Sequence, residues 1–362
     1  MASIEDYIVE QFTLTDSEIP GLVKLLTSAF QEDGSAEKEG ASIELLEDNF
    51  ELIFGVPSID KEMFVRTKHK ETNEIVGFLG SIKQRLSIEG KIHTISLPCW
   101  LSVHRAHRKR GIGKAMGRKM MEMVLERNYD LAVTFHDASQ KGLETSQAVS
   151  RDTGKPLELL TFMKRFIIRP LHVDDAATVI KLPWIVKAYV KTKERVGKIK
   201  SSQVRLLKPE DIDQICELTT DLSNKTQVAL VQECEDIRWK LSNPRVLCVV
   251  HENEQGQIDG FINAWEFLLA GFGKAVKFGW MDTVHTYNLP QKEIISLANL
   301  LSSEARKRGW KGIQSPFIPY FDAKPFRKAN FILFPKKIGM YVFNLSGISL
   351  PKKVDSIYFE WR

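Results

Sequence analysis

The sequence predicts a mixed α+β fold that occurs twice in tandem. The chain has 362 residues, which corresponds to about two domains of ordinary size. Segments typical of strands, hairpins and amphipathic helices alternate along it. Each half contains them in the same order: strand, helix pair, antiparallel strands, helix and strand. This order predicts, in each copy, a mixed, mostly antiparallel sheet flanked by helices rather than a doubly wound parallel sheet.

Each copy begins with a strand end that leads into a helix. In residues 12–26, Thr15 and Asp16 stand before an amphipathic pattern, and either could cap a helix. Residues 204–218 have the same order, with Pro209 at the position where a helix begins.

A hairpin follows in each copy, and then a helix with a strand. Residues 63–79 contain two apolar runs around a polar turn, and residues 246–262 repeat this arrangement. A helix and strand at residues 119–135 match a second pair at residues 294–317. Each match alone is common in proteins, but three in one order predict two tandem domains of one fold.

Three regions result from these matches. We expect a first domain at residues 1–168, a linker helix with a basic tail at residues 169–202, and a second domain at residues 203–362. The linker carries a run of lysines: Lys187, Lys191, Lys193, Lys198 and Lys200. Such a run is typical of a solvated linker helix. The alternative is a surface for an anionic ligand.

The composition is that of a globular protein without strong charge. Hydrophobic residues make up 43% and charged residues 27%, which excludes the disordered and fibrous classes. The formal net charge of +5 is too small to indicate a nucleic-acid partner. No run approaches the ~18 apolar residues of a membrane span, and the N-terminus has no secretory signal pattern. We therefore expect a cytoplasmic protein with no membrane partner.

The cysteines support the same expectation. Cys99, Cys216, Cys234 and Cys248 show no short paired spacing. We therefore expect buried thiols rather than disulfides or a zinc site. A reducing compartment fits this pattern.

The segment that predicts chemistry is a basic, glycine-containing loop. Residues 101–113 read Leu-Ser-Val-His-Arg-Ala-His-Arg-Lys-Arg-Gly-Ile-Gly and lie between an apolar strand at 95–103 and a helix at 114–127. A loop in this position presents backbone N–H groups and the positive end of the helix dipole to an anion. The residues therefore predict a clamp for phosphate or pyrophosphate. The glycine spacing matches neither a nucleotide P-loop nor a dinucleotide fingerprint.

The loop resembles motif A of the GNAT acyltransferases, Val-x-Pro-x-Tyr-Arg-x-x-Gly-x-Gly/Ala. Val103, Arg108, Gly111 and Gly113 fall on its defining positions, whereas Arg105 and His107 replace the commoner Pro and aromatic residue. The resemblance implies that the loop binds acyl-CoA, in the simplest case acetyl-CoA, as co-substrate without a metal. Main-chain groups of Leu101, Ser102 and Val103 would hold pantetheine. The pyrophosphate would lie on Arg108, Lys109, Arg110, Gly111, Ile112, Gly113 and Lys114.

The second copy departs from this motif. Residues 281–293 contain no glycine, so we do not expect them to bind CoA in the same way. Residues 326–331 resemble the closing Tyr-x-x-x-Gly-Phe segment of the family. One intact domain followed by a degenerate one is similar in layout to the N-myristoyltransferases and to tandem bacterial acetyltransferases. The peptide-site signatures of the former are not recognisable here.

The catalytic residues are less clearly marked. Acyl transfer to an amine needs a base for the amine proton and an acid for the leaving thiolate. The glutamate that many GNATs carry on the motif A strand is missing from residues 95–100, and Ser150 stands where many have a tyrosine. His136 is the candidate base or thiolate donor, and the alternative is a histidine that caps a strand end. Ser150 could protonate the thiolate through water. The C-terminal carboxylate of Arg362 is a further candidate base by analogy alone.

An acidic segment follows the first predicted helix. It contains Glu32, Asp33, Glu37, Glu39, Glu44, Glu47, Asp48 and Glu51. In GNATs this region borders the acceptor site, so an acidic wall there would favour a cationic amine. The alternative is a solvated acidic helix. We therefore expect a GNAT N-acetyltransferase acting on a primary amine, and the alternatives are a longer-chain acyltransferase or an inactive acyl-CoA-binding protein.

Overall fold

The computed structural model describes residues 4–31, 41–137 and 142–360. The chain divides into two compact units. The first consists of the N-terminal segment, Ile43–Phe162 and Lys337–Val354, and the second mainly of Met163–Lys336 and the segment from Asp355 onward. Each unit therefore contains residues from distant parts of the sequence.

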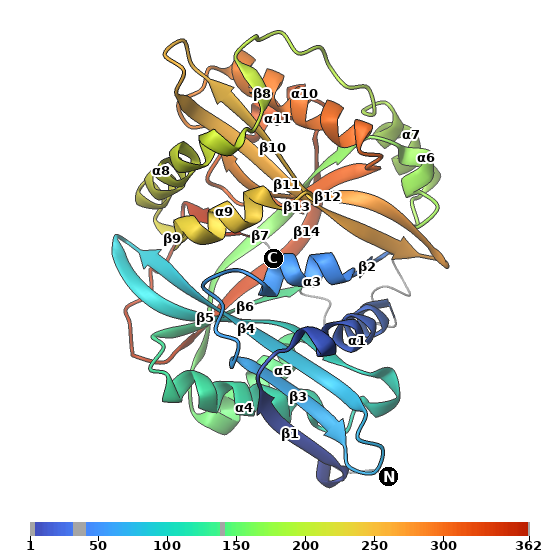
Figure 1. Cartoon of the computed structure of the whole chain (residues 1–362), viewed down its shortest axis with the longest axis vertical. Helices are drawn as coiled ribbons and strands as arrows, with labels where there is room; N and C mark the ends of the chain where they lie inside the picture. Colours follow the sequence, from blue (N-terminus) through green and yellow to red (C-terminus); the bar gives the residue numbers. More distant parts are fainter. Residues whose placement is uncertain (1–3, 32–40, 138–141, 361–362) are drawn as a thin grey trace. The chain divides into compact units, whose positions relative to one another are not determined.

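The first unit contains most elements up to the strand at which the chain passes into the second (Figure 1). They are η1 (Ile4–Asp6), β1 (Tyr7–Phe12), η2 (Asp16–Glu18), α1 (Ile19–Gln31), β2 (Ser42–Glu44), α3 (Glu47–Phe54), β3 (Phe64–His69), β4 (Ile75–Ile88), β5 (Lys91–Val103), η3 (Arg105–His107), α4 (Ile112–Glu126), β6 (Leu131–Asp137), α5 (Gly142–Thr153) and β7 (Leu157–Pro170).

The sheet of the first unit has the order β1-β3-β4-β5-β6-β14. Its β5–β6 pair is parallel, and the β1–β3, β3–β4, β4–β5 and β6–β14 pairs are antiparallel. The predicted mixed, mostly antiparallel sheet is therefore confirmed. The last strand comes from the far end of the chain, because residues 338–344 of β14 pair with β6.

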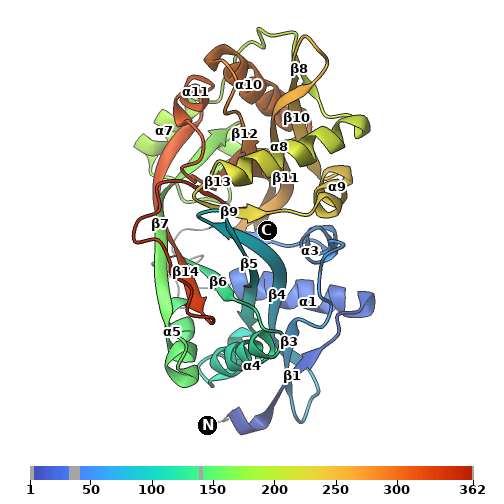
Figure 2. The same ribbon diagram turned by 90° about the vertical axis from the view of Figure 1, so that its left-hand side faces the viewer.

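Helices cover both faces of this sheet (Figure 2). A Cβ at Gly77 of β4 would touch Met116 of α4, and a Cβ at Gly80 would touch Phe54 of α3. Positions three apart on a strand face opposite sides, so α4 and α3 lie on opposite faces. The α4 side is filled by methionines and aliphatic residues, and the α3 side by an aromatic cluster that includes Phe64. Burial of these side chains from water is the main force that holds the unit together.

The second unit contains the remaining elements, with β7 and β14 passing from one unit into the other. They are α6 (Val173–Ala176), α7 (Trp184–Lys191), β8 (Val204–Leu206), η4 (Pro209–Asp211), α8 (Ile212–Asn224), β9 (Val228–Val231), α9 (Cys234–Ser242), β10 (Val246–Glu252), β11 (Ile258–Gly271), β12 (Lys274–His285), α10 (Gln291–Lys307), β13 (Gly312–Pro316), α11 (Ala323–Lys328), β14 (Ile332–Asn344) and β15 (Ile357–Tyr358).

The second unit repeats the architecture of the first. Its sheet has the order β7-β13-β12-β11-β10-β8, and again one pair, β12–β13, is parallel. A residue with positive φ stands two positions after the last residue of both α4 and α10, Asn128 at 55° and Gly309 at 79°. A buried aromatic residue follows in each case, Tyr129 and Trp310. The same helix-ending geometry at matched positions supports the predicted repeat.

The cysteine expectation needs one correction. Cys216 of α8 and Cys234 of α9 form a disulfide, although buried thiols were expected. The packing of α8 on α9 brings together two residues that lie 18 positions apart, and sequence spacing alone does not reveal this. Cys248 is buried and Cys99 is partly buried, and burial raises the pKa of both thiols. No helix within the described ranges is long and apolar enough to cross a membrane.

Candidate functional site

The first feature of the site is a gap that opens between two parallel strands. β5 and β6 are paired at Ile95↔Leu131 and Ser96↔Ala132. These are the first two residues of β6, and β5 continues from there to Val103. The pairing is therefore confined to one end, and the strands extend beyond it as the two sides of a splay.

A β-bulge in β5 explains why the strands separate. Phe78 pairs with Ser102 and Gly80 with Cys99, so two residues of β5, Trp100 and Leu101, oppose one residue of β4. Trp100 has φ 61°, in the left-handed region. A bulge bends its strand and leaves backbone groups outside the ladder. The bend therefore frees main-chain donors and acceptors at the positions where the sequence predicts pantetheine binding.

Each strand also carries a buried hydroxyl near this splay. Among the described residues, neither Ser102 Oγ of β5 nor Thr134 Oγ1 of β6 has a hydrogen-bond partner. A buried polar group without a partner is costly. Both hydroxyls therefore keep unused hydrogen-bonding capacity close to the splay.

The loop after β5 has the backbone of an anion site. Lys109 has φ 64° and Gly111, the N-cap of α4, has φ 83°. Left-handed residues at alternate positions turn successive N–H groups toward one side and form a concave anion-binding nest. The first turn of α4 contains no acidic side chain, so its N–H groups and dipole add to the same positive field.

Side chains hold this loop in place. Arg108 donates to the carbonyl oxygens of Val103 at 3.1 Å and Ala29 at 2.6 Å, which fixes the loop to the end of β5 and to α1. The hydroxyl of Tyr7 lies 2.5 Å from Arg110 Nη1 and 2.8 Å from His107 Nδ1. Burial, then the charge of Arg110, lowers the pKa of His107. Arg108, expected to bind pyrophosphate, therefore has a structural task as well.

The helix α5 packs across the first turns of α4. A Cβ at Gly113 would lie 3.8 Å from Thr145, and a Cβ at Gly117 would lie 2.7 Å from Val149. The absence of side chains at these two positions lets α5 approach. This close packing brings Thr145 and Val149 of α5 onto the first two turns of α4.

His136 and Ser150, the predicted catalytic residues, both have partners. His136 Nε2 lies 3.0 Å from Ser146 Oγ, and burial lowers the pKa of His136 to about 4. The imidazole is therefore neutral at pH 7, with one ring nitrogen a donor and the other an acceptor, and the tautomer decides which of the two faces Ser146. Ser150 Oγ donates to the carbonyl of Lys155 at 2.7 Å. A catalytic role for either residue stays a prediction.

Several residues at this site carry no signal in the sequence. Tyr7 lies about a hundred positions before the loop that it supports, and its role follows from the pairing of β1 with β3. Asp152 of α5 contacts Lys114 only because α5 packs on α4. Trp100 could have been identified only through the bulge. The loop could be identified because its glycines and basic residues lie next to one another in the sequence. The residues that support the loop from distant parts of the chain could not be identified in this way.

The second unit has the same splay and bulge. β12 and β13 are paired at Gly279↔Ile313 and Trp280↔Gln314. On the other edge of β12, Ile262↔Val284 and Ala264↔Met281 leave Asp282 and Thr283 opposite Asn263. The β-bulge and the short parallel pairing that separate two strands in the first unit are therefore both present in the second.

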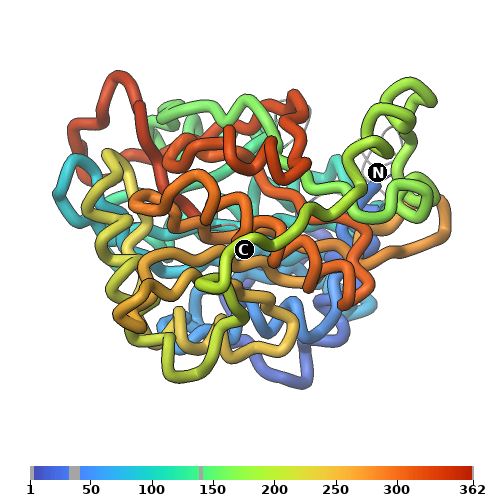
Figure 3. Tube along the Cα trace, turned by 90° about the horizontal axis from the view of Figure 1, so that it is seen from above, coloured from blue at the N-terminus to red at the C-terminus, as the bar shows by residue number. Residues whose placement is uncertain are grey.

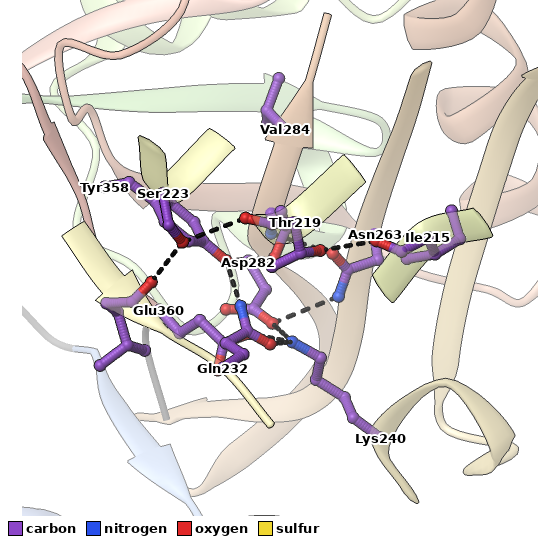
Figure 4. Close-up of polar contacts among 12 residues, drawn as sticks. Ile215, Thr219, Ser223, Gln232, Lys240, Asn263, Asp282, Val284, Tyr358 and Glu360 are labelled. Atoms are coloured by element: carbon purple, nitrogen blue, oxygen red, sulfur yellow. Dashed lines mark hydrogen bonds and ion pairs between the residues drawn. The ribbon is translucent and has the colours of Figure 1, made fainter. Parts of the chain in front are cut away.

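Side chains of the second unit occupy its bulge (Figure 4). Asn263 donates to Asp282 at 3.2 Å and accepts from the backbone N–H of Thr283 at 3.0 Å. Lys240 donates to Asp282 at 2.8 Å and to Glu360. The backbone N–H of Val284, the residue after the bulge, donates to the hydroxyl oxygen of Tyr320 at 3.1 Å. Backbone groups at the bulge that would bind a ligand in the first unit are therefore hydrogen-bonded to side chains of the protein in the second unit.

The start of α10 also differs from the start of α4. Glu293, a buried residue of the first turn, places a carboxylate where α4 has none. Its Oε2 lies 3.6 Å from His251 Nε2. The N-terminus of a helix stabilises negative charge, so a carboxylate there occupies the place where an anionic ligand would bind. This geometry supports the expectation that the second copy does not bind CoA as the first would.

The acidic segment is described only in part. Glu32, Asp33, Glu37, Glu39 and the carboxylate of Arg362 lie outside the described residues. Glu47, Asp48 and Glu51 are exposed on α3, and Phe50 and Phe54 of the same helix are core residues. Within the described ranges, no group of three or more His, Cys, Asp or Glu side chains is arranged to hold a metal.

Comparisons with known proteins agree with this architecture. Residues 12–136 match the family model described as "Acetyltransferase (GNAT) domain". No curated protein matches the sequence significantly. Two solved structures of Saccharomyces cerevisiae N-myristoyltransferase with bound myristoyl-CoA are similar at 16% and 17% identity. They have TM-scores of 0.76 and 0.75, cover 95% and 98% of this chain, and are themselves covered to 84% and 83%.

A bacterial protein is a more distant structural neighbour. A probable N-acyltransferase from Enterococcus faecalis has a TM-score of 0.51 at 10% identity and covers 94% of this chain, with 73% of its own chain covered. At these identities the likeness shows the fold alone. Residues 12–136 therefore match a GNAT domain, and the chain has the tandem fold seen in N-myristoyltransferase.

Proposed function

We propose that the chain is an acyl-CoA-dependent N-acyltransferase whose first unit binds the acyl-CoA. The observation that carries this proposal is the loop between Arg108 and Gly113. Its left-handed residues and the first turn of α4, which holds no acidic side chain, form an anion site directly after a bulged strand. A phosphate site continued by free strand backbone fits the pyrophosphate and pantetheine parts of one ligand.

The chemistry would follow from this arrangement. The amine nitrogen attacks the thioester carbonyl carbon, the carbon–sulfur bond breaks, and the amine loses a proton while the thiolate gains one. Backbone N–H groups at the Trp100 bulge are suited to stabilise the oxyanion that forms on the carbonyl. We assign the proton from the amine to His136 and the proton to the thiolate to Ser150, acting through water. The variants His136→Gln and Ser150→Ala test these two assignments.

The length of the transferred acyl chain has two candidates. Acetyl transfer is the simplest activity for a GNAT domain. The tandem fold supports a longer chain as second candidate, because the yeast neighbours that match 95% or more of this chain have myristoyl-CoA bound. The exposed carboxylates on α3 would favour a cationic acceptor such as a polyamine or a peptide N-terminus. We propose no metal requirement and a cytoplasmic location, for which the Cys216–Cys234 disulfide removes the argument from free thiols.

Thermal unfolding with CoA, acetyl-CoA and myristoyl-CoA is the first test. A ligand that binds only the native state raises the unfolding temperature by mass action. We expect a rise with every CoA species, and a larger rise with one acyl length names the acyl donor. No rise at saturating concentration of any species would contradict the proposal.

Turnover separates an enzyme from an inactive binding protein. Release of the CoA thiol that requires an added amine supports transfer, whereas binding without release supports the inactive alternative. His136→Gln and Ser150→Ala should lower the rate without changing CoA affinity. If both variants keep the full rate, the proton transfers belong to other groups.

A further inference from the structure

The linker helix α7 exposes apolar side chains of the kind that helices usually bury. Trp184 is 78% exposed, Ile185 63% and Tyr189 56%, and Ala188 is also exposed. At 100° per residue, these four positions fall within an arc of roughly 140° on the helix. One continuous face of α7 is therefore apolar and open to solvent. We call it the α7 face.

Contacts within the second unit hold α7 with this face outward. Val186 and Val190 are half-buried on the opposite side of the helix. Lys187 and Lys191 pair with Asp174 of α6, at 2.9 Å and 2.5 Å. The ribbon and the tube both show α6 and α7 together at the edge of the second unit (Figures 1 and 3). The exposure thus belongs to a helix whose opposite side is half-buried and whose lysines pair with α6.

The segment that carries this face is strongly basic. Between residues 181 and 200 the only acidic residue is Glu194. The basic residues of this segment are Lys181, Lys187, Lys191, Lys193, Arg195, Lys198 and Lys200. Lys193 lies over the ring of Tyr189, with Nζ 5.7 Å from the ring centroid. Ile199, between two exposed lysines, is itself 41% exposed. Exposed apolar and cationic side chains therefore lie close together along this segment of the sequence.

This combination matches the interface of a lipid bilayer better than a protein partner. Tryptophan and tyrosine are enriched where hydrocarbon meets headgroups, and lysine stems reach from apolar surface to charged headgroups. Lysine is depleted in protein–protein interfaces, whereas six of the seven basic residues here are lysines. Anionic headgroups would supply the charge that complements them.

We propose that the α7 face binds peripherally to membranes that contain anionic lipids, with Trp184, Ile185 and Tyr189 at the depth of the headgroups and the lysines on the phosphates. The expectation of no membrane partner rested on the lack of an apolar run long enough to span a bilayer. A helix that lies in the interface needs no such run. The proposal does not depend on CoA binding.

Vesicle flotation of the full chain tests this binding. We expect the protein to float with vesicles of phosphatidylcholine and phosphatidylserine, to float far less with phosphatidylcholine alone, and to be released by high salt. The double variant Trp184→Ser, Ile185→Ser should lower partitioning at least about tenfold, because the inserted apolar area is lost. Lys198→Glu with Lys200→Glu should lower it on anionic vesicles.

A matched control keeps the test specific. Phe272, in the turn between β11 and β12, is 63% exposed, as Ile185 is. Phe272→Ser should leave partitioning unchanged. The proposal is overturned if the wild-type chain stays with the soluble fraction, or if Phe272→Ser reduces flotation as much as the double variant does. It is also overturned if sedimentation shows that Trp184→Ser dissociates an oligomer, which would make the α7 face a contact between copies of the chain.

Discussion

The carboxylate of Asp152, in the last turn of α5, lies 2.9 Å from the ammonium of Lys114, in the first turn of α4. The hydrogen bond from Lys114 lowers the pKa of Asp152, so this carboxylate stays ionised at neutral pH. It places a negative charge beside the loop assigned to pyrophosphate. The pair therefore adjusts the field that an anionic ligand would meet.

Asp152→Asn should strengthen CoA binding, and Lys114→Met should weaken it. The first variant removes a negative charge near the anion site, and the second removes a positive charge and leaves Asp152 without this partner. Each change should be about threefold at low salt and smaller at high salt, because both groups are partly exposed. Calorimetry with CoA at two salt concentrations measures both. Effects of the same sign in the two variants would contradict the electrostatic argument.

Gly111→Glu should abolish measurable CoA binding. The residue has φ 83° and open space around the position of a Cβ, so a side chain would be strained and would place a carboxylate on the anion site. Gly90, in the turn between β4 and β5, has φ 82° and similar open space. Gly90→Glu therefore carries the same backbone strain without the local charge. Calorimetry should show binding lost in the first variant and kept in this control, and equal loss in both would point to strain alone.

The loop could be predicted from the sequence because its determinants are local. The two glycines, the basic residues and the strand and helix on either side all lie within residues 95–127. The bulge at Trp100 could not be predicted, since a left-handed tryptophan is contrary to its intrinsic preference and depends on the pairing of β4 with β5.

Contacts between residues far apart in the sequence could not be predicted from the sequence pattern either. The strand β14 reads as part of the second copy, yet residues 338–344 pair with β6 of the first unit. Strand periodicity shows which residues share a face but not which strand is the neighbour. The disulfide between Cys216 and Cys234 was missed for the same reason, because helix packing rather than spacing brings the two sulfurs together.

Lys240→Met should destabilise the second unit by about 3 kcal/mol, because removal of one partner from a buried ion pair leaves uncompensated charge. The side chains of Lys240, Asp282 and Glu360 are at most 5% exposed. The matched control is Lys225→Met, whose pair with Asp221 is about 40% exposed on both sides and should cost less than about 1 kcal/mol. Urea unfolding followed by tryptophan fluorescence measures both variants. Equal midpoints for the two would show that the buried cluster contributes no more than a surface pair.

His136 should make the first unit less stable as the pH falls from about 7 to 4. Burial lowers the pKa of His136 to about 4, from an unfolded value of about 6.5. Between these values the unfolded chain binds a proton that the folded chain does not, so stability rises with pH in this window. The contribution lost between pH 7 and pH 5 is about 2 kcal/mol.

His136→Gln removes this titration while keeping a side chain that can reach Ser146. Urea unfolding at a series of pH values should therefore give a shallower loss of stability in the variant between pH 7 and pH 4. Above about pH 8 the histidine is neutral in both states, so the difference between variant and wild type should be constant there, which provides an internal control. Parallel curves across the whole range would mean that the imidazole of His136 is solvated in the folded protein. In that case burial would not hold His136 neutral, and the ring would titrate close to the ordinary pKa of histidine.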